Sequence, residues 1–312
     1  MHREIDSLIR RKNISLWILL CSLILAACQQ KHVPAGKDLL AVVDDLKRDV
    51  RFRNFPRRII SLAPSITETL FALNADSLIA GVTSYCDYPA AAKRKTKVGD
   101  LVHPSSEAII SAQPDLIIMT VEGNTQQTFE DLSRLGLNIF MTNPRTIQGV
   151  MKSITDLGKI TRMEARAKLL VDSVQSLIDR RESAQSAPKP SVLMFVSFEP
   201  LMVVGRNSFI DELITQAGGL NIASNAKSTY PVLNREEIVQ RNPDIILIPD
   251  DINIPFDEIR AQYPEWRFVN AVKHKNVFYV DANVLQRPGP RIIDGLKLLK
   301  KIFKTKELEG IN

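Results

Sequence analysis

The strongest constraint on the fold is a helix–turn–strand unit that the sequence contains twice. The first copy runs from Ser105 to Ile118 and the second from Asn234 to Leu247. In each copy a capping residue precedes a helix with a glutamate in its first turn, and a Pro-Asp pair separates this helix from an apolar strand. A repeat of this size predicts two lobes of similar build.

Other segments alternate between strand and helix patterns. Apolar strands are predicted at 58–62, 80–83 and 191–196, and the polar run 44–49 between apolar residues predicts a β-hairpin. Ser65 and Glu68 have the spacing of a capping box, which predicts a helix after the first of these strands. Strand, helix and strand in this order indicate βαβ units, and therefore an α/β fold with largely parallel sheets. The predicted lobes span residues 41–145 and 187–304, with a tail at 305–312.

A helical connector is predicted between the lobes, at residues 146–186. One helix runs from Thr146 to about Leu157, and a longer one runs from about Thr161 to Ser183. Thr161 and Glu164 again have capping-box spacing, and apolar residues follow at steps of three and four. At 1.5 Å per residue the longer helix would be roughly 30–35 Å long. Such a rod predicts that lobe closure is small.

The N-terminus resembles a lipoprotein signal. A basic stretch precedes the uncharged run from Ile14 to Ala27, which is shorter than the roughly 20 residues of a spanning helix. Small residues then lead to Cys28, as in a bacterial lipobox. We therefore expect a signal peptide at 1–27, lipidation and membrane anchoring at Cys28, and a tether at 28–40. The alternative is an ordinary signal peptide with a cysteine nearby. Either places the protein outside the cytoplasm and leaves Cys86 as a thiol of unassigned role.

Several function classes are poorly supported by composition and motifs. A net charge of +6 over 312 residues lacks the concentrated basic face of a nucleic-acid binder. Neither a P-loop nor a G-x-S-x-G motif occurs. Within the predicted lobes, His103 and His274 are too few for a zinc or manganese site. We therefore expect a monomeric non-enzyme without a metal or cofactor of its own.

Five segments together resemble one protein family. They are RIISLAPSITETLFAL (58–73), SYCDYP (84–89), the two Glu…Pro-Asp units, GRNSFIDELITQAGGLNI (205–222) and RPGPRIIDGL (287–296). Their order resembles that of the cobalamin- and ferric-siderophore-type substrate-binding proteins of ABC importers, over about residues 40–303. The resemblance implies two Rossmann-like lobes joined by a single long helix, the class III periplasmic-binding-protein fold. It also implies a bound metal chelate and, as partner, a permease dimer with its ATPase.

The resemblance assigns a partner contact to one glutamate in each lobe. Glu107 and Glu236 occupy the places of the family's permease-docking glutamates, and the internal repeat identifies the same pair independently. The alternative is that each glutamate only stabilises the start of its helix, by about 0.3–1 kcal/mol. Symmetric placement on two lobes favours docking on a two-fold permease.

Four residues are candidates for ligand contact, because ligands of α/β sheets bind at the carboxyl ends of strands. Tyr85 and Tyr230 offer flat amphipathic rings, and Arg287 offers a fork of donors. The alternatives are that Tyr230 packs a turn before Pro231 and that Arg287 ties down the C-terminal helix. Ser65 is first a helix cap and only secondarily a ligand contact.

The identity of the ligand stays open at this stage. Cobalamin binders of the family line their cleft with tryptophans, whereas this chain has Leu101 and Thr120 where such tryptophans are expected. Trp266 falls in a stretch that is structural in the family. The YCDYP and RPGPR segments favour cobalamin or another corrinoid, with a ferric siderophore or haem as the alternative. A hydrolase or a scaffold lipoprotein is the alternative from another class.

Overall fold

The computed structural model describes residues 39–179 and 188–309, with side chains up to residue 304. The predicted signal peptide, Cys28 and nearly all of the predicted tether lie outside the described residues. Within the described part of the chain, no helix is long and apolar enough to cross a bilayer. Residues 40–312 form one compact unit.

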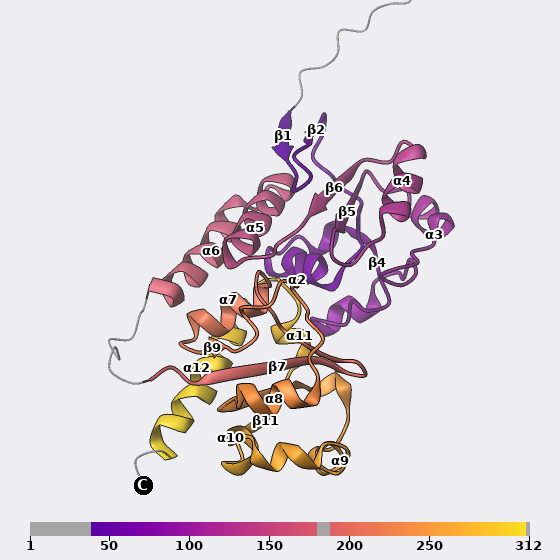
Figure 1. Ribbon diagram of the computed structural model, residues 1–312. Helices are drawn as coiled ribbons and strands as arrows, with labels where there is room; N and C mark the ends of the chain where they lie inside the picture. The colour runs from indigo at the N-terminus through magenta and orange to yellow at the C-terminus, as the bar shows by residue number, and fades with distance from the viewer. Residues whose placement is uncertain (1–38, 180–187, 310–312) are drawn as a thin grey trace, which may run out of the picture. The chain divides into compact units, whose positions relative to one another are not determined.

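The first lobe is built on a four-stranded parallel sheet, in the order β4-β3-β5-β6. Figure 1 labels β4, β5 and β6 of this sheet. The predicted hairpin is confirmed, since β1 and β2 pair antiparallel. The strands are β1 (Leu40–Val43), β2 (Asp49–Phe52), β3 (Ile59–Ser61), β4 (Ile79–Val82), β5 (Leu116–Thr120) and β6 (Ile139–Thr142), and the helices are α2 (Pro64–Ala72), α3 (Ser106–Ser111) and α4 (Gln126–Arg134).

The second lobe is built on a five-stranded mixed sheet, in which β7 pairs with both β10 and the short β9 in parallel and with β8 antiparallel. The strands are β7 (Ser191–Phe198), β8 (Leu201–Val203), β9 (Leu220–Asn221), β10 (Ile245–Pro249) and β11 (Val277–Val280). The helices are α7 (Phe209–Gln216), α8 (Arg235–Arg241), α9 (Phe256–Gln262), α10 (Asn270–Lys273), α11 (Ala282–Leu285) and α12 (Ile292–Glu309).

The two sheets share one topology, which confirms the prediction of two similarly built lobes. In the first, the parallel order is β4-β3-β5-β6, and in the second it is β9-β7-β10-β11. The opening strand of each lobe thus lies between the second and third strands. The antiparallel β8 is an addition without a counterpart in the first sheet.

The repeated Pro-Asp pair has the same structural role in both lobes. Asp115 accepts hydrogen bonds from the backbone N–H groups of Arg57 and Arg58, at 2.7 and 3.0 Å. Asp244 accepts from the backbone N–H and hydroxyl of Ser191, at 3.0 and 2.8 Å. Each aspartate therefore fixes the start of its lobe's first strand beside its own strand, which explains why the pair recurs.

The connector consists of α5 (Ile147–Thr161) and α6 (Glu164–Asp179). The prediction that Thr161 caps the second helix is wrong, because its hydroxyl donates to Leu157 O at 2.7 Å inside α5. Arg162 ends α5 in the left-handed conformation, at φ 61°. The described 16 residues of α6 span about 24 Å, and the predicted continuation towards Ser183 lies outside the described residues.

The two connector helices approach each other closely at Gly158. A Cβ atom there would lie 2.5 Å from the Cβ of Ala167, so only glycine allows this separation. Gly158, which we expected near the end of the first helix, instead serves as a contact point one turn before that end.

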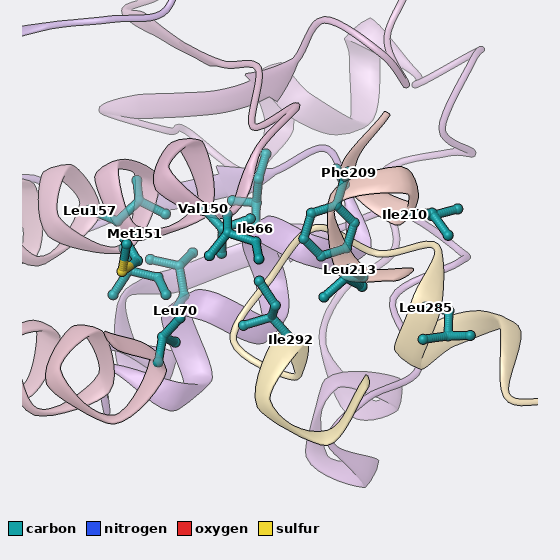
Figure 2. Packing of buried hydrophobic residues seen from close by; sticks show 14 of the residues in the cluster. Ile66, Leu70, Val150, Met151, Leu157, Phe209, Ile210, Leu213, Leu285 and Ile292 are labelled. Carbon is teal, nitrogen blue, oxygen red and sulfur yellow. The ribbon is translucent and has the colours of Figure 1, made fainter. Parts of the chain in front are cut away.

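One apolar cluster joins the two lobes through the connector. It contains residues of α2 from the first lobe, α5 from the connector, and α7, α11 and α12 from the second lobe. Figure 2 shows Ile66 beside Val150, and Phe209 and Leu213 near Ile292. Since buried apolar area is the main stabilising contribution in a fold, this cluster holds the two lobes and the connector together.

Candidate ligand-binding cleft

A cleft of about 610 Å³ lies between the two lobes, within the range of small-molecule sites. Its walls are segments that follow the carboxyl ends of strands in both sheets, as expected for an α/β fold. The first lobe contributes Ala63, Pro64, Ser65, Tyr85, Leu101, Thr120, Glu122, Gly123, Pro144 and Arg145, and the second contributes Val196, Phe209, Ile210, Thr229, Tyr230, Asp251, Ala282, Asn283, Gln286, Arg287 and Pro288.

All four residues that we predicted as ligand contacts line this one cleft. Ser65 and Tyr85 come from the first lobe, and Tyr230 and Arg287 come from the second. The two positions where tryptophans were expected, Leu101 and Thr120, also line it. Contact of these residues with a ligand stays a prediction.

The predicted capping box at Ser65 and Glu68 is wrong. Helix α2 begins at Pro64 after Ala63, and no side chain caps it. Proline suits the first turn of a helix, because its missing N–H would have no partner there. Ser65 is therefore free of a capping role, and Glu68 is buried with only 2% of its surface exposed.

Glu68 forms ion pairs with two arginines of the other lobe. Arg291 donates from Nε and Nη2 to its two carboxylate oxygens, at 2.8 and 2.7 Å, and Arg287 Nη1 donates at 3.0 Å. Burial alone would lower the pKa of Arg291, but its hydrogen bonds to Glu68 raise it. Arg291 also lies over the ring of Tyr88, 4.3 Å from its centroid. The first lobe thus surrounds this guanidinium from two directions.

Arg287 is the member of this network that reaches the cleft. Besides its bond to Glu68, its Nη1 donates to Asp87 Oδ1 at 2.7 Å, and its Nη2 donates to the carbonyl of Tyr85 at 3.4 Å. Burial alone would raise the pKa of Asp87, but the hydrogen bond and charge of Arg287 outweigh it and lower the pKa. The partners of Arg287 all lie in the first lobe, so these bonds tie the segment that precedes α12 to that lobe. Contact of Arg287 with a ligand stays a prediction.

The two cleft tyrosines differ in exposure. Tyr85 is 58% exposed and Tyr230 is 37% exposed. Burial, and then the Glu122 carboxylate of the opposite lobe, raise the pKa of Tyr230, while Arg145 opposes this effect. Tyr230 is therefore a neutral phenol, and it lines the same cleft as Glu122 of the first lobe.

A close backbone approach holds the segment that carries Tyr230. Gly205 N–H donates to Thr229 O at 2.8 Å, and a Cβ on Gly205 would lie 2.6 Å from both Pro231 Cδ and Ser228 O. Glycine at this position lets the loop pack directly on the chain that follows β8. Tyr230 thus both belongs to a packed turn and lines the cleft.

The charges that line the cleft are largely balanced. Arg145 Nε lies 3.1 Å from Glu122 Oε1, and Arg287 is paired as described. Asp251 adds an exposed carboxylate. Among the described residues that line the cleft, both cations are therefore ion-paired, and the wall offers neutral donors, aromatic faces and apolar side chains.

Sequence reasoning missed the partners of Arg287 and several wall residues. Glu122 and Arg145 follow the carboxyl ends of β5 and β6, a signal that strand ends alone could have provided. No local signal identifies Glu68 or Asp87, because their partner Arg287 lies 219 and 200 positions away in the chain.

Trp266 and Cys86 lie in the protein interior. Trp266 is 1% exposed and stacks on Phe195 and Tyr263, with centroids 5.5 and 4.5 Å apart, as expected for a structural stretch. The Cys86 thiol is 1% exposed and lies 3.1 Å from the hydroxyl of Thr67, which gives it a packing role beside the cleft loop. No group of three or more histidine, cysteine and acidic residues among the described residues is placed to hold a metal ion.

Glu107 and Glu236 are exposed in the first turns of α3 and α8, the helices of the repeated unit. The backbone N–H of Glu107 and then the Ser105 hydroxyl, which donates at 3.0 Å, lower its pKa. In α8 the capping box uses Asn234 and Glu237, so Glu236 is left for other contacts. The two glutamates occupy equivalent places in the two lobes.

A family model described as periplasmic binding protein matches residues 59–284, which includes the strands of both parallel-stranded sheets but not the β1–β2 hairpin. The chain belongs to the periplasmic binding protein family. The class III fold inferred above is thereby shown for this family member, with its two α/β lobes and helical connector.

Named relatives and solved structures are similar over most of the chain. The uncharacterized ABC transporter substrate-binding lipoprotein YvrC of Bacillus subtilis is 31% identical, over 93% of this chain and 96% of its own length. The crystal structure of the periplasmic vitamin B12 binding protein BtuF of Vibrio cholerae is 25% identical with a TM-score of 0.71, covering 81% of this chain and 98% of that one. The apo periplasmic heme-binding protein RhuT of Roseiflexus sp. RS-1 has the same identity and TM-score, covering 79% and 97%.

Proposed function

We propose that this family member is the substrate-binding component of an ABC importer and that it captures a corrinoid, such as cobalamin, in the cleft between its lobes. The observation that carries the proposal is the cleft itself, with aromatic rings from both lobes and ion-paired cations in its walls. The names of YvrC and BtuF support the importer class.

The balanced charge of the cleft favours a corrinoid over the other chelates. The peripheral side chains of the corrin ring are neutral carboxamides, and the one phosphodiester of cobalamin lies in its nucleotide loop rather than on the ring edge. Haem carries propionate carboxylates on the macrocycle itself, and ferric catecholates are anionic. Because Arg145 and Arg287 are already paired and Asp251 is negative, a carboxylate entering this cleft meets no unpaired cation. Burying a charge without a partner costs much more than burying a neutral amide that finds hydrogen bonds.

Haem is the second candidate, and Tyr85 is the observation that favours it. Phenolate oxygen is a known axial ligand of haem iron, and Tyr85 is well exposed in the cleft. RhuT, which is named as heme-binding, has the same fold. The raised pKa of Tyr230 makes that residue the poorer iron ligand, because the phenolate is the form that coordinates.

Glu107 and Glu236 support the delivery step. They lie at equivalent places of the two lobes, so a two-fold permease with a basic residue on each subunit would meet both. Exposed charges of this kind orient a complex more than they add affinity. The lipid on Cys28 would keep the binding protein at the membrane surface, where such a permease lies.

Calorimetric titration of the soluble chain tests the proposal. We expect sub-micromolar, one-to-one binding of cobalamin and cobinamide, with weaker binding of haem and ferric siderophores. Tight binding of haem alone, lost in Tyr85→Phe, would establish the second candidate instead. Silence from all four ligands, or turnover in a hydrolase panel, would overturn the importer assignment.

A further inference from the structure

The ion network between the lobes bears on which ligands the cleft accepts. We propose that Asp87 and Glu68 are specificity-determining positioning residues, which neutralise Arg287 and fix its guanidinium so that it donates to uncharged carbonyl oxygens and discriminates against carboxylates. The inference rests on the proposed function, since it concerns ligands of the same cleft.

The protein uses only some of the N–H donors of Arg287. A guanidinium has five N–H donors. The protein uses both hydrogens of Nη1, for Glu68 and Asp87, and one hydrogen of Nη2, for Tyr85 O. Nε–H and the second hydrogen of Nη2 have no partner among the described residues. Arg287 therefore offers two donors from a side chain that is only 16% exposed.

Two carboxylates of the protein compensate the positive charge of the Arg287 guanidinium. Glu68 is shared with Arg291, so it compensates part of each arginine, and Asp87 compensates Arg287 directly at 2.7 Å. The lowered pKa of Asp87 means that this compensation is present at neutral pH. A neutral carbonyl oxygen accepts from such donors without needing a net positive charge. A carboxylate at the same place would lie within reach of two carboxylates of the protein, and like charges that close repel.

Arg287 and its two carboxylate partners belong to different lobes. Glu68 lies on α2 and Asp87 follows β4, both in the first lobe, whereas Arg287 follows α11 in the second. Arg287 has this position and this neutralised charge only when the two lobes are in contact. The same three side chains therefore determine both the approach of the lobes and the chemistry of the donor.

The test compares ligands that differ by one ionised group. Cobalamin is compared with its monocarboxylic acid, in which one peripheral carboxamide is hydrolysed, and haem dimethyl ester is compared with haem. Each pair is titrated into the wild-type chain, into Asp87→Asn and into Asp172→Asn. Asp172 is a matched control, because it forms an exposed ion pair with Lys168 on α6 and does not line the cleft.

For any pair that binds, we expect the wild-type chain and Asp172→Asn to bind the neutral member at least tenfold more tightly than the acid. Asp87→Asn keeps the shape of the side chain but removes its charge, so it should shift the ratio of the two dissociation constants at least fivefold towards the acid. Glu68→Gln should shift the ratio in the same direction wherever the variant folds. A role in folding alone would weaken both ligands equally and leave the ratio unchanged.

The outcomes separate this inference from the proposed function. An unchanged ratio in Asp87→Asn, with cobalamin still bound, overturns the inference and leaves the corrinoid assignment intact. A wild-type chain that already prefers the acid also overturns it. If neither pair binds to any variant, the proposed function fails and the inference fails with it.

Discussion

The two lobes are alike in their framework and different where they face each other. In both, a helix with an exposed glutamate leads through a Pro-Asp pair to an inner strand, and the aspartate fixes the start of the neighbouring strand. At the cleft, the first lobe supplies carboxylates that pair with arginines of the second. The shared parts hold the fold, and we propose that they also carry the permease contact whereas the divergent parts select the ligand.

The symmetric pair of glutamates should show the largest effect. Ala at both Glu107 and Glu236 should reduce uptake to background in cells that carry the cognate permease, while the affinity for ligand is unchanged. The reason is that both side chains are exposed outside the cleft. Uptake of labelled ligand and calorimetry are the two measurements.

Glu130→Ala, an exposed glutamate on α4 outside the repeated positions, serves as the control and should leave uptake normal. A large loss of ligand affinity in the double variant would contradict the docking role. Equal uptake by the double variant and the wild-type chain would contradict it as well.

The next largest effect is expected on stability, when the ion pairs of Glu68 with Arg287 and Arg291 are broken. Glu68→Ala leaves the Arg291 guanidinium, which is 12% exposed, without its buried carboxylate partner, and breaking a buried pair typically costs about 3–5 kcal/mol. The measurement is the free energy of unfolding from a denaturant titration. Asp172→Ala, which removes an exposed pair, should cost less than about 1 kcal/mol. Similar values for the two variants would show that the lobes do not depend on Glu68.

The two Pro-Asp aspartates offer a direct comparison between the lobes. Asp244→Ala should destabilise by about 1–3 kcal/mol, because it leaves partly buried donors at Ser191 unpaired. Asp115→Ala should cost less, because Asp115 is exposed and water can replace it at the N–H groups of Arg57 and Arg58. Thermal unfolding of both variants measures the difference. A greater loss from Asp115→Ala than from Asp244→Ala would contradict this dependence on burial.

The smallest expected effect is that of pH. Since the pKa of Asp87 is lowered below 3.8, the contribution of its pairing is fully present above that value and is lost only as the pH falls through the lowered pKa. No histidine is among the described residues that line the cleft. The dissociation constant for cobalamin should therefore stay constant between about pH 7 and pH 5. A change in this dissociation constant near pH 6 would contradict the prediction, because it would show that a group titrating there contributes to binding.

Local sequence patterns predicted the framework well because the framework is made locally. The strands at β3, β5, β7 and β10 and the helices before β5 and β10 follow from apolar runs, caps and Pro-Asp pairs that lie within about fifteen residues of one another. The four cleft residues followed from strand ends and from the resemblance.

The same patterns failed where a distant partner competes with a local one. Ser65 and Glu68 have the spacing of a capping box, yet Glu68 pairs with arginines more than 200 positions away. The spacing between Thr161 and Glu164 failed for a local reason instead, because Thr161 lies inside α5 and its hydroxyl donates to Leu157 O. The Glu68 carboxylate forms charge-assisted hydrogen bonds with arginines, which are stronger than a bond to the start of its own helix. Neither residue spacing nor helix propensity predicts where an arginine of the other lobe lies.

Amide hydrogen exchange with and without cobalamin tests the central claim, that one ligand contacts both lobes in the cleft. The account predicts protection of the backbone after the carboxyl ends of strands in both lobes, at residues 62–66, 83–88, 120–124, 228–231 and 282–288. Protection confined to one lobe, or placed away from these segments, would contradict it.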